Sequence, residues 1–93
     1  MIVYLSGAVT SRLETYKRDF ERAEVFCKEQ GYTVLNPSVL PKDLKPESYM
    51  PICFAMIDAS DAIFMIKGWE KSHGATLEKA YAGYQNKMVI MET

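Results

Sequence analysis

The chain has 93 residues, of which 48% are hydrophobic and 25% are charged, and 11 basic residues nearly balance 12 acidic ones. This length suits one small domain, expected to span residues 1–93, and the ordinary composition excludes intrinsic disorder and low-complexity sequence. No basic stripe or polybasic segment indicates a nucleic-acid polymer or a membrane surface as partner. No apolar stretch approaches the roughly 20 residues that span a bilayer.

The first residues and the cysteines indicate a reduced, cytoplasmic setting. Residues 1–5 lack the cationic start and the longer apolar segment of a signal peptide. Cys27 and Cys53 match no zinc or redox spacing, and His73 is the only histidine. We therefore expect two free thiols, no metal and no cofactor.

The first part of the chain predicts two strands separated by a helix. The β-branched and aromatic run 2–5 ends at Ser6-Gly7, which is typical of a buried strand entering a turn. A helix is predicted over 12–30, with Ser11 and Glu14 as a capping box and Gly31 following its end. Residues 32–35 then predict a second strand. The apolar stripe of the helix is formed by Leu13, Tyr16, Phe20, Ala23 and Cys27.

The second part of the chain begins with a proline-rich loop over 38–47, of a length that is more often functional than idle. A helix is predicted over 49–59 with Pro51 in its first turn, followed by a strand over 62–66. A further helix over 74–86 and a last strand over 87–91 complete the pattern. The apolar face expected for that helix consists of Leu77, Ala80, Tyr81 and Tyr84.

Alternating strands and helices of this kind predict an α/β fold. The expected architecture is a small doubly wound, Rossmann- or flavodoxin-like sheet of about four parallel strands with helices on both faces. Four strands enclose a thin core, so we expect a homodimer or a higher homo-oligomer formed through an apolar helix face.

Ligands of open parallel sheets bind beyond the carboxyl ends of the strands. That edge carries residues 6–12, 36–38 and 67–78. Asp58 and Asp61 precede a strand and therefore fall at the opposite edge, where a structural role is expected for Asp61.

The segment 68–78 is the most informative part of that edge. A helix starting at Ser72 or Gly74 leaves unpaired backbone amides, which suit an anion. Glu78 lies about one turn into the helix, where the helix dipole favours an ionised carboxylate and thus a nucleophile for an anomeric carbon. The alternative is an exposed first-turn glutamate that caps its own helix, and spacing alone leaves both interpretations open.

Other side chains at this edge also have a functional and a structural interpretation. Gly7 either lets the backbone approach a ligand or marks a tight turn. Tyr4 either packs in the core or reaches the edge with its hydroxyl, and Trp69 either stacks on a base or covers apolar surface. Arg12, Lys71 and His73 either contact a phosphate or are ordinary charged or solvated surface residues.

In order and spacing, the sequence resembles the nucleoside 2-deoxyribosyltransferase-like superfamily, and most closely a small phage and prophage branch related to the 2′-deoxynucleoside 5′-phosphate N-hydrolases. The resemblance covers nearly the whole chain. Its segments are Ile2-Val3-Tyr4-Leu5-Ser6-Gly7, Gly31-Tyr32, Asn36-Pro37, Tyr49-Met50, Asp61-Ala62-Ile63 and the stretch from Gly68 through Ala75 to Glu78.

The resemblance implies cleavage or exchange of the N-glycosidic bond of a 2′-deoxynucleoside or its 5′-monophosphate, with Glu78 attacking C1′ of the sugar. It also implies a tyrosine near the sugar at Tyr4, a 5′-phosphate contact at Ser72, and a dimeric or larger assembly. The other expected substrate-binding residues are Ser6, Gly7, Asn36, Cys53, Trp69 and Gly74, with Trp69 stacking on the base.

One residue departs from the family pattern. Relatives carry an aspartate, which binds or protonates the departing base, at the position occupied here by Cys53. A thiol is a far weaker acid, and losing that proton transfer lowers rates by roughly 10²–10⁴-fold. The sequence therefore favours either an N-glycosidase or deoxyribosyltransferase, or a catalytically weakened module that binds a nucleotide or signalling molecule. A third alternative is a protein-interaction domain that uses the Trp69 loop and the proline-rich loop.

Overall fold

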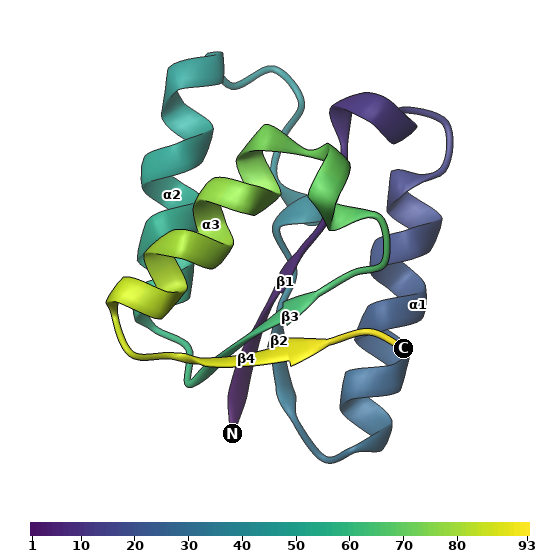
Figure 1. Ribbon diagram of the computed structural model, residues 1–93. Helices are drawn as coiled ribbons and strands as arrows, with labels where there is room; N and C mark the ends of the chain where they lie inside the picture. The colour runs from purple at the N-terminus through teal and green to yellow at the C-terminus, as the bar shows by residue number, and fades with distance from the viewer.

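The computed structural model describes residues 1–93 and follows the alternating order that the sequence predicts (Figure 1). The strands are β1 (Ile2–Ser6), β2 (Thr33–Leu35), β3 (Ala62–Met65) and β4 (Met88–Met91). The helices are α1 (Tyr16–Glu29), α2 (Pro46–Asp58) and α3 (His73–Tyr84). Short 3-10 helices η1 (Thr10–Arg12), η2 (Pro37–Val39) and η3 (Trp69–Lys71) follow the first three strands.

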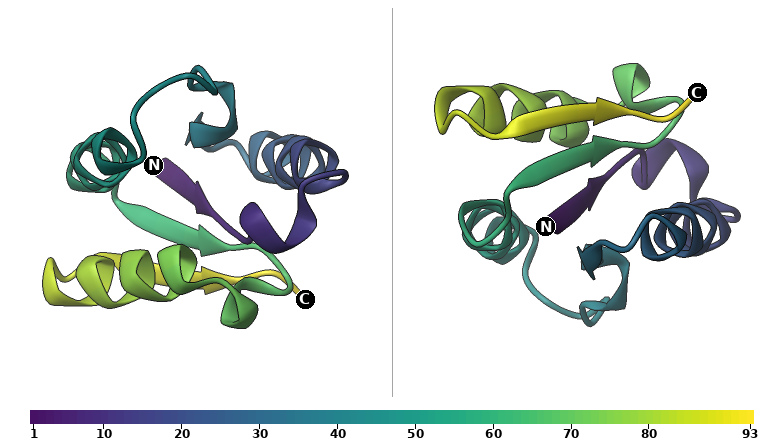
Figure 2. Two further views of the ribbon diagram at one scale, coloured as in Figure 1. Left: turned by 90° about the horizontal axis from the view of Figure 1, so that it is seen from above. Right: turned by 90° about the horizontal axis from the view of Figure 1, so that it is seen from below.

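All strand pairs are parallel, and the strands lie in the order β2-β1-β3-β4. Helix α1 covers one face of the sheet, and α2 and α3 cover the other (Figure 2). This arrangement confirms the predicted α/β class with about four parallel strands and helices on both faces. The strand order reverses beside β1, which is where open sheets of this kind form a ligand crevice.

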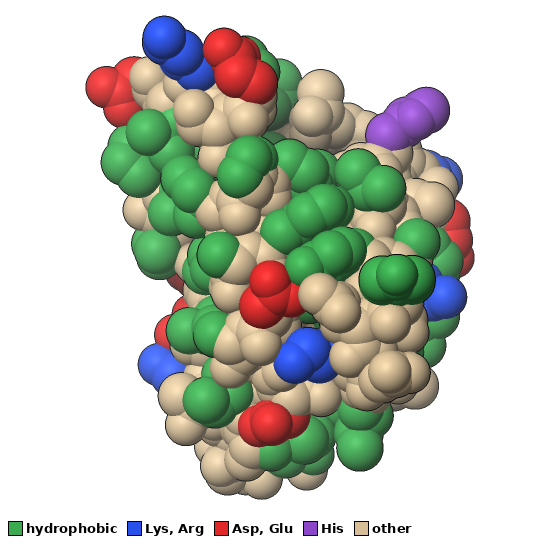
Figure 3. Space-filling model, turned by 90° about the vertical axis from the view of Figure 1, so that its left-hand side faces the viewer, with side chains coloured by type: hydrophobic (Ala, Val, Ile, Leu, Met, Phe, Trp, Pro, Cys, Tyr) green, Lys and Arg blue, Asp and Glu red, His purple; other side chains and the backbone are tan.

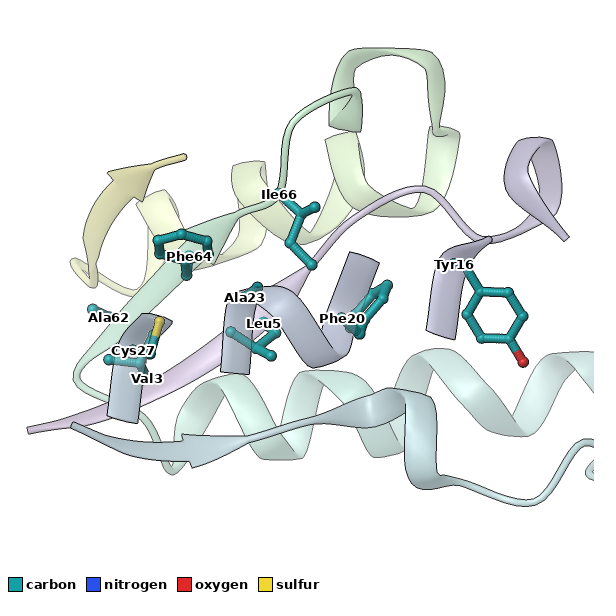
Figure 4. Packing of buried hydrophobic residues seen from close by; sticks show 9 residues of the cluster. All are labelled: Val3, Leu5, Tyr16, Phe20, Ala23, Cys27, Ala62, Phe64 and Ile66. Atoms are coloured by element: carbon teal, nitrogen blue, oxygen red, sulfur yellow. The ribbon is translucent and has the colours of Figure 1, made fainter. Parts of the chain in front are cut away.

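Side chains of the central strands alternate between two buried clusters, because successive residues of a strand point to opposite faces. Val3 and Leu5 of β1 point towards α1 and pack with Phe20 and other apolar side chains (Figure 4). Tyr4 points the other way, into the cluster under α2 and α3. The next residue on that second face is Ser6, at the carboxyl end of β1.

Helix α1 starts later than predicted. It begins at Tyr16 instead of residue 12, and its N-cap Thr15 makes no side-chain cap bond, so the capping box of Ser11 and Glu14 was a wrong prediction. The preceding residues turn as η1, and Leu13 is 69% exposed instead of lying on the buried stripe. This start is favoured by a tertiary contact, since Arg12 Nε lies 2.6 Å from Asp19 Oδ2.

The end of α1 was predicted correctly. Gly31 has a φ of +86°, a conformation that glycine adopts without strain. Its amide bonds to the Lys28 carbonyl at 2.9 Å, and the Tyr32 amide bonds to the Cys27 carbonyl at 3.1 Å. These two bonds form a Schellman motif that satisfies the last carbonyls of the helix.

Helix α2 begins at Pro46, which occupies a favourable first position. Pro51 therefore lies inside the helix. The sequence-based prediction that placed Pro51 in the first turn was wrong.

Helix α3 presents a different face to the sheet from the one predicted. Its buried residues are Ala75, Glu78 and Ala82, whereas Leu77 is half exposed and Tyr84 is 84% exposed. Small alanine side chains let the helix lie close to the strands, and a buried glutamate hides this face from a hydrophobicity pattern. The exposed apolar side chains contribute to a hydrophobic surface over α2 and α3 (Figure 3).

The opposite edge of the sheet carries Asp61, whose Oδ2 accepts a 2.7 Å hydrogen bond from the Ile2 amide. The contact ties the start of β1 to the start of β3, which is the structural role expected for this residue. None of the helices is long and apolar enough to cross a membrane.

Candidate active site

A buried carboxylate lies at the carboxyl end of the sheet. Glu78 comes from the second turn of α3, and its Oε1 accepts a 2.7 Å hydrogen bond from the Ser6 hydroxyl. Its Oε2 accepts a 3.0 Å hydrogen bond from the Tyr4 hydroxyl. Tyr4 and Ser6 are two residues apart on β1 and therefore point to the same face of the sheet. The first strand thus holds both oxygens of a side chain that lies more than 70 positions later in the chain.

Glu78 is only 7% exposed, and both of its hydrogen-bond donors are neutral hydroxyls. Burial raises the pKa of Glu78, and the Ser6 and Tyr4 hydroxyls, together with the nearby Cys53 thiol, oppose that rise. The helix dipole contributes little here because its effect falls off within the first turn. The interpretation of Glu78 as an exposed residue capping its own helix is therefore wrong.

Cys53 reaches the same cluster from α2. Its thiol is 7% exposed and lies close enough to Tyr4 and Glu78 to shift the pKa of both groups. Burial raises the pKa of Cys53 itself to about 11, so this side chain is a neutral thiol at physiological pH. Both cysteines are free, and neither belongs to a group of residues that would hold a metal ion.

These residues line a cavity of about 980 Å³ at the carboxyl ends of the strands. Its size matches pockets for nucleotide-sized ligands. Among the lining residues, Lys42 and Lys71 are cationic, and Glu78 is the only aspartate or glutamate. The proline-rich loop forms one wall, where the Tyr49 hydroxyl of α2 donates a hydrogen bond to the Pro41 carbonyl.

The start of α3 forms another wall of the cavity. Ser72 is the N-cap, which decides between the two helix starts that the sequence left open, and its Oγ accepts a 3.1 Å hydrogen bond from the Ala75 amide. Ser72, His73 and Gly74 all line the cavity. Gly7 also lines the cavity, and a Cβ atom there would approach the Ile66 side chain to 3.0 Å. Its close approach is therefore to the segment following β3.

The family described as "Domain of unknown function (DUF4406)" matches residues 1–91. The chain belongs to the DUF4406 family. No curated protein matches its sequence.

Two solved structures are similar to the DUF4406 chain. The CMP N-glycosidase BcmB from Clostridium botulinum has 23% identity and a TM-score of 0.72, covering 98% of this chain and 70% of the other. A 2-deoxyribosyltransferase from Leishmania mexicana has 18% identity and a TM-score of 0.75, with 97% and 62% covered. These likenesses confirm, at the level of the fold, the resemblance to nucleoside 2-deoxyribosyltransferase-like proteins. The DUF4406 chain spans about two thirds of the length of both structures.

The fold brings most of the predicted site residues of the DUF4406 protein to this one cavity. Tyr4, Gly7, Cys53, Ser72, Gly74 and Glu78 line it, and Ser6 lies behind Glu78 as a hydrogen-bond donor. The sequence reasoning missed Lys42, Tyr49 and Met50 as lining residues, although the proline-rich loop and the Tyr49-Met50 motif were signals for them.

Two predicted site residues lie elsewhere. Trp69, on η3, packs against the buried cluster under α2 and α3, with Lys79 Nζ 5.4 Å from its ring centroid, and does not line the cavity. Asn36 caps η2 and donates a 2.8 Å hydrogen bond to Glu24, beside a separate surface groove of about 500 Å³.

Proposed function

We propose that this DUF4406 protein cleaves the N-glycosidic bond of a nucleoside or nucleotide, or transfers its sugar, with Glu78 as the nucleophile. The observation that carries the proposal is the buried Glu78 carboxylate, held by two hydroxyls and facing a cavity of nucleotide size. The substrate class is supported by the two similar structures, a CMP N-glycosidase and a 2-deoxyribosyltransferase.

In this reaction a Glu78 oxygen attacks C1′ of the sugar as the bond to the base breaks, giving a glycosyl ester. Water, or a second base, then attacks the same carbon and releases Glu78. The hydroxyls of Tyr4 and Ser6 fix the carboxylate in one orientation, which lowers the entropy lost on reaching the attack geometry. Only the ionised carboxylate attacks, so the raised pKa of Glu78 shifts the acid limb of the activity to higher pH.

The rest of the cavity suits the sugar and its 5′ substituent. Ser72 and Gly74 stand at the N-terminus of α3, where backbone amides favour an anion, and Lys71 adds a positive charge. Gly7 lines the same cavity. These residues would bind a 5′-phosphate or a 5′-hydroxyl.

The test is chromatographic detection of free base after incubation with ribo- and 2′-deoxynucleosides and their 5′-monophosphates, with and without an acceptor base. We expect release by the wild type and none by Glu78→Gln, which keeps the size of the side chain. Glu70→Gln changes an exposed glutamate on η3 and serves as the matched control, with unchanged release. Release that persists in Glu78→Gln would refute the assignment of the nucleophile.

A nucleotide-binding module without turnover is the second candidate, and Cys53 favours it because a neutral thiol replaces an acid in the cavity. In this case nucleotides raise the melting temperature, since a ligand bound to the native state stabilises it, while no base is released. A protein-interaction domain would show neither effect.

We further propose that the protein forms a homodimer, or a larger homo-oligomer, through the hydrophobic surface over α2 and α3. Leu77 and Tyr84 are exposed on this surface, and the stacked pair Phe54 and Tyr81 joins the two helices at 4.1 Å between ring centroids. Light scattering of the wild type and of Tyr84→Glu tests the proposal, which fails if both are monomers at the same concentration. The two free, buried thiols suit a reducing compartment, and we propose the cytoplasm.

A further inference from the structure

The cavity contains a single carboxylate. Of the 23 residues that line it, only Glu78 is an aspartate or glutamate. Glycoside cleavage ordinarily uses two carboxyl groups, because one attacks or activates the nucleophile while the other protonates the departing group. An enzyme that uses Glu78 for the attack therefore has no carboxylic acid in this chain to protonate the base.

The other titratable side chains of the cavity do not replace that acid well. Burial raises the pKa of Tyr4 far above its usual value, and burial also raises that of Cys53 to about 11. His73 is exposed at the start of α3. The remaining titratable side chains of the lining belong to two further tyrosines and two lysines: Tyr16, Tyr49, Lys42 and Lys71.

We propose that the preferred substrate is a nucleotide whose base is already cationic, joined to C1′ through a quaternary ring nitrogen, as in pyridinium or N-alkylated purine nucleotides. This inference rests on the proposed function and specifies its leaving group. The lack of a second carboxyl group in the cavity then selects for bases that leave without receiving a proton.

The chemistry balances without an acid. A Glu78 oxygen forms a bond to C1′, and the electron pair of the breaking bond returns to the cationic ring nitrogen, so the base leaves as a neutral molecule. Water then adds to C1′, Glu78 departs as a carboxylate, and one proton is released to solvent. A neutral base would leave as an anion unless it received a proton, and lack of that proton transfer costs roughly 10²–10⁴-fold in rate.

The charges of the cavity support the same substrate. Glu78 forms no ion pair, and its two partners are uncharged hydroxyls, so its negative charge is unneutralised in a buried place. A cationic ring beside C1′ supplies the missing positive charge. Lys42 and Lys71 line the same cavity and suit the phosphate of such a nucleotide. The ligand that matches this pattern is cationic at the base and anionic at the 5′ end.

The experiment compares two nucleotides that differ by one methyl group. 7-Methylguanosine 5′-monophosphate carries a cationic base and guanosine 5′-monophosphate a neutral one, and nicotinamide mononucleotide and CMP extend the series. We expect the cationic member of the guanosine pair to be hydrolysed at least about 10²-fold faster, after division by the uncatalysed rates. Release above the uncatalysed rate should vanish in Glu78→Gln.

Placing a carboxylic acid at Cys53 provides a second readout of the preference for a cationic base. Cys53→Asp introduces a carboxyl group beside Glu78, whose negative charge raises the pKa of the new acid and suits it to donate a proton. We expect the preference for the cationic base to narrow at least tenfold in Cys53→Asp, and not in the matched, non-acidic Cys53→Asn. His73→Gln controls for the exposed histidine and should leave the preference as it is.

The outcomes separate this inference from the function on which it rests. Glu78-dependent release of neutral bases at rates equal to those of cationic bases leaves the glycosidase proposal intact and overturns the inference. A preference that depends on His73 overturns it as well, because an acid is then present. Absence of Glu78-dependent release from every nucleotide overturns the proposed function and the inference together.

Discussion

Removing the Tyr4 hydroxyl should raise the pKa of Glu78 while leaving the fold intact. Tyr4 is fully buried, and its hydroxyl donates to Glu78 Oε2 at 3.0 Å. Tyr4→Phe removes this donor and keeps the ring that packs in the cluster under α2 and α3. The ionised form of Glu78 then loses one of its two hydroxyl partners, whereas the protonated form loses less.

The size of the effect follows from the type of hydrogen bond. A hydrogen bond to a charged group contributes about 1.5–3 kcal/mol, and one pKa unit corresponds to about 1.4 kcal/mol. Tyr4→Phe should therefore raise the pKa of Glu78 by about one to two units. Ser6→Ala should act in the same direction, because the Ser6 hydroxyl donates to Oε1 at 2.7 Å.

The titration can be followed without a substrate, by the carbon-13 shift of the Glu78 carboxyl group in labelled protein. The sign for stability follows from the raised pKa. A group whose folded-state pKa lies above its unfolded value loses its stabilising contribution as the pH rises through the folded pKa. The free energy of unfolding of Tyr4→Phe should therefore keep falling to a higher pH than that of the wild type, and each curve should level off above its own folded-state pKa.

Tyr81→Phe is the matched control. Its hydroxyl donates to the exposed Asp58 at 2.7 Å, on the outer side of α2 and α3, so its removal should not affect Glu78. A Glu78 pKa in Tyr4→Phe that is equal to or lower than that of the wild type would refute the arrangement of donors around the carboxylate. Equal shifts in both variants would show that the effect is not local.

The remaining predictions concern stability. Glu78→Gln removes a buried charge with no ionic partner and should raise the melting temperature at pH 8 but not at pH 4, in thermal scans at both values. Gly7→Ala should lower the free energy of unfolding in urea by about 1–3 kcal/mol, because its Cβ would lie 3.0 Å from the Ile66 side chain that follows β3. The matched Gly83→Ala, which has nothing within 4 Å of its Cβ, should raise the free energy of unfolding by about 0.5–1 kcal/mol. Stabilisation by Gly7→Ala and destabilisation by Gly83→Ala would contradict this packing. Burial alone would raise the pKa of Glu92, but hydrogen bonds from Arg22 lower it, so the pair stabilises the fold above the unfolded pKa and less as the pH falls. Arg22→Ala should therefore destabilise by less than about 1 kcal/mol at pH 7, and its cost should shrink as the pH falls through the lowered pKa values of Glu92 and Asp19. A cost that does not change with pH would exclude the ion pairs as its cause.

Local patterns predicted the parts of the fold that depend on neighbouring residues. The apolar runs predicted the strands, and Gly31 predicted the end of α1. The start of α1 was missed because it depends on the tertiary pairing of Arg12 with Asp19, which competes with a local capping box. The inward face of α3 was missed because its buried residues are two alanines and Glu78, which a hydrophobicity pattern assigns to solvent.

The candidate site was predictable to the extent that topology determines it. The rule that ligands bind at the carboxyl edge, together with the family resemblance, led to Glu78, Tyr4, Cys53 and Ser72, which the fold brings to one cavity. The position of Trp69 depends on how η3 turns, and no local pattern carries that information. The hydrogen bond from the Ser6 hydroxyl to Glu78 likewise depends on the distance between the sheet and α3, which no local pattern predicts.

The placement of Trp69 has a practical consequence for spectroscopy. It is the only tryptophan of the protein, and it precedes by a few residues the helix that carries Glu78. Its indole packs against the cluster that contains Cys53 and Tyr4 and lies near the ammonium group of Lys79. Emission excited at the red edge, where the tyrosines do not absorb, therefore comes from one known position. Its wavelength and intensity report the movement of α3 over the sheet in unlabelled protein.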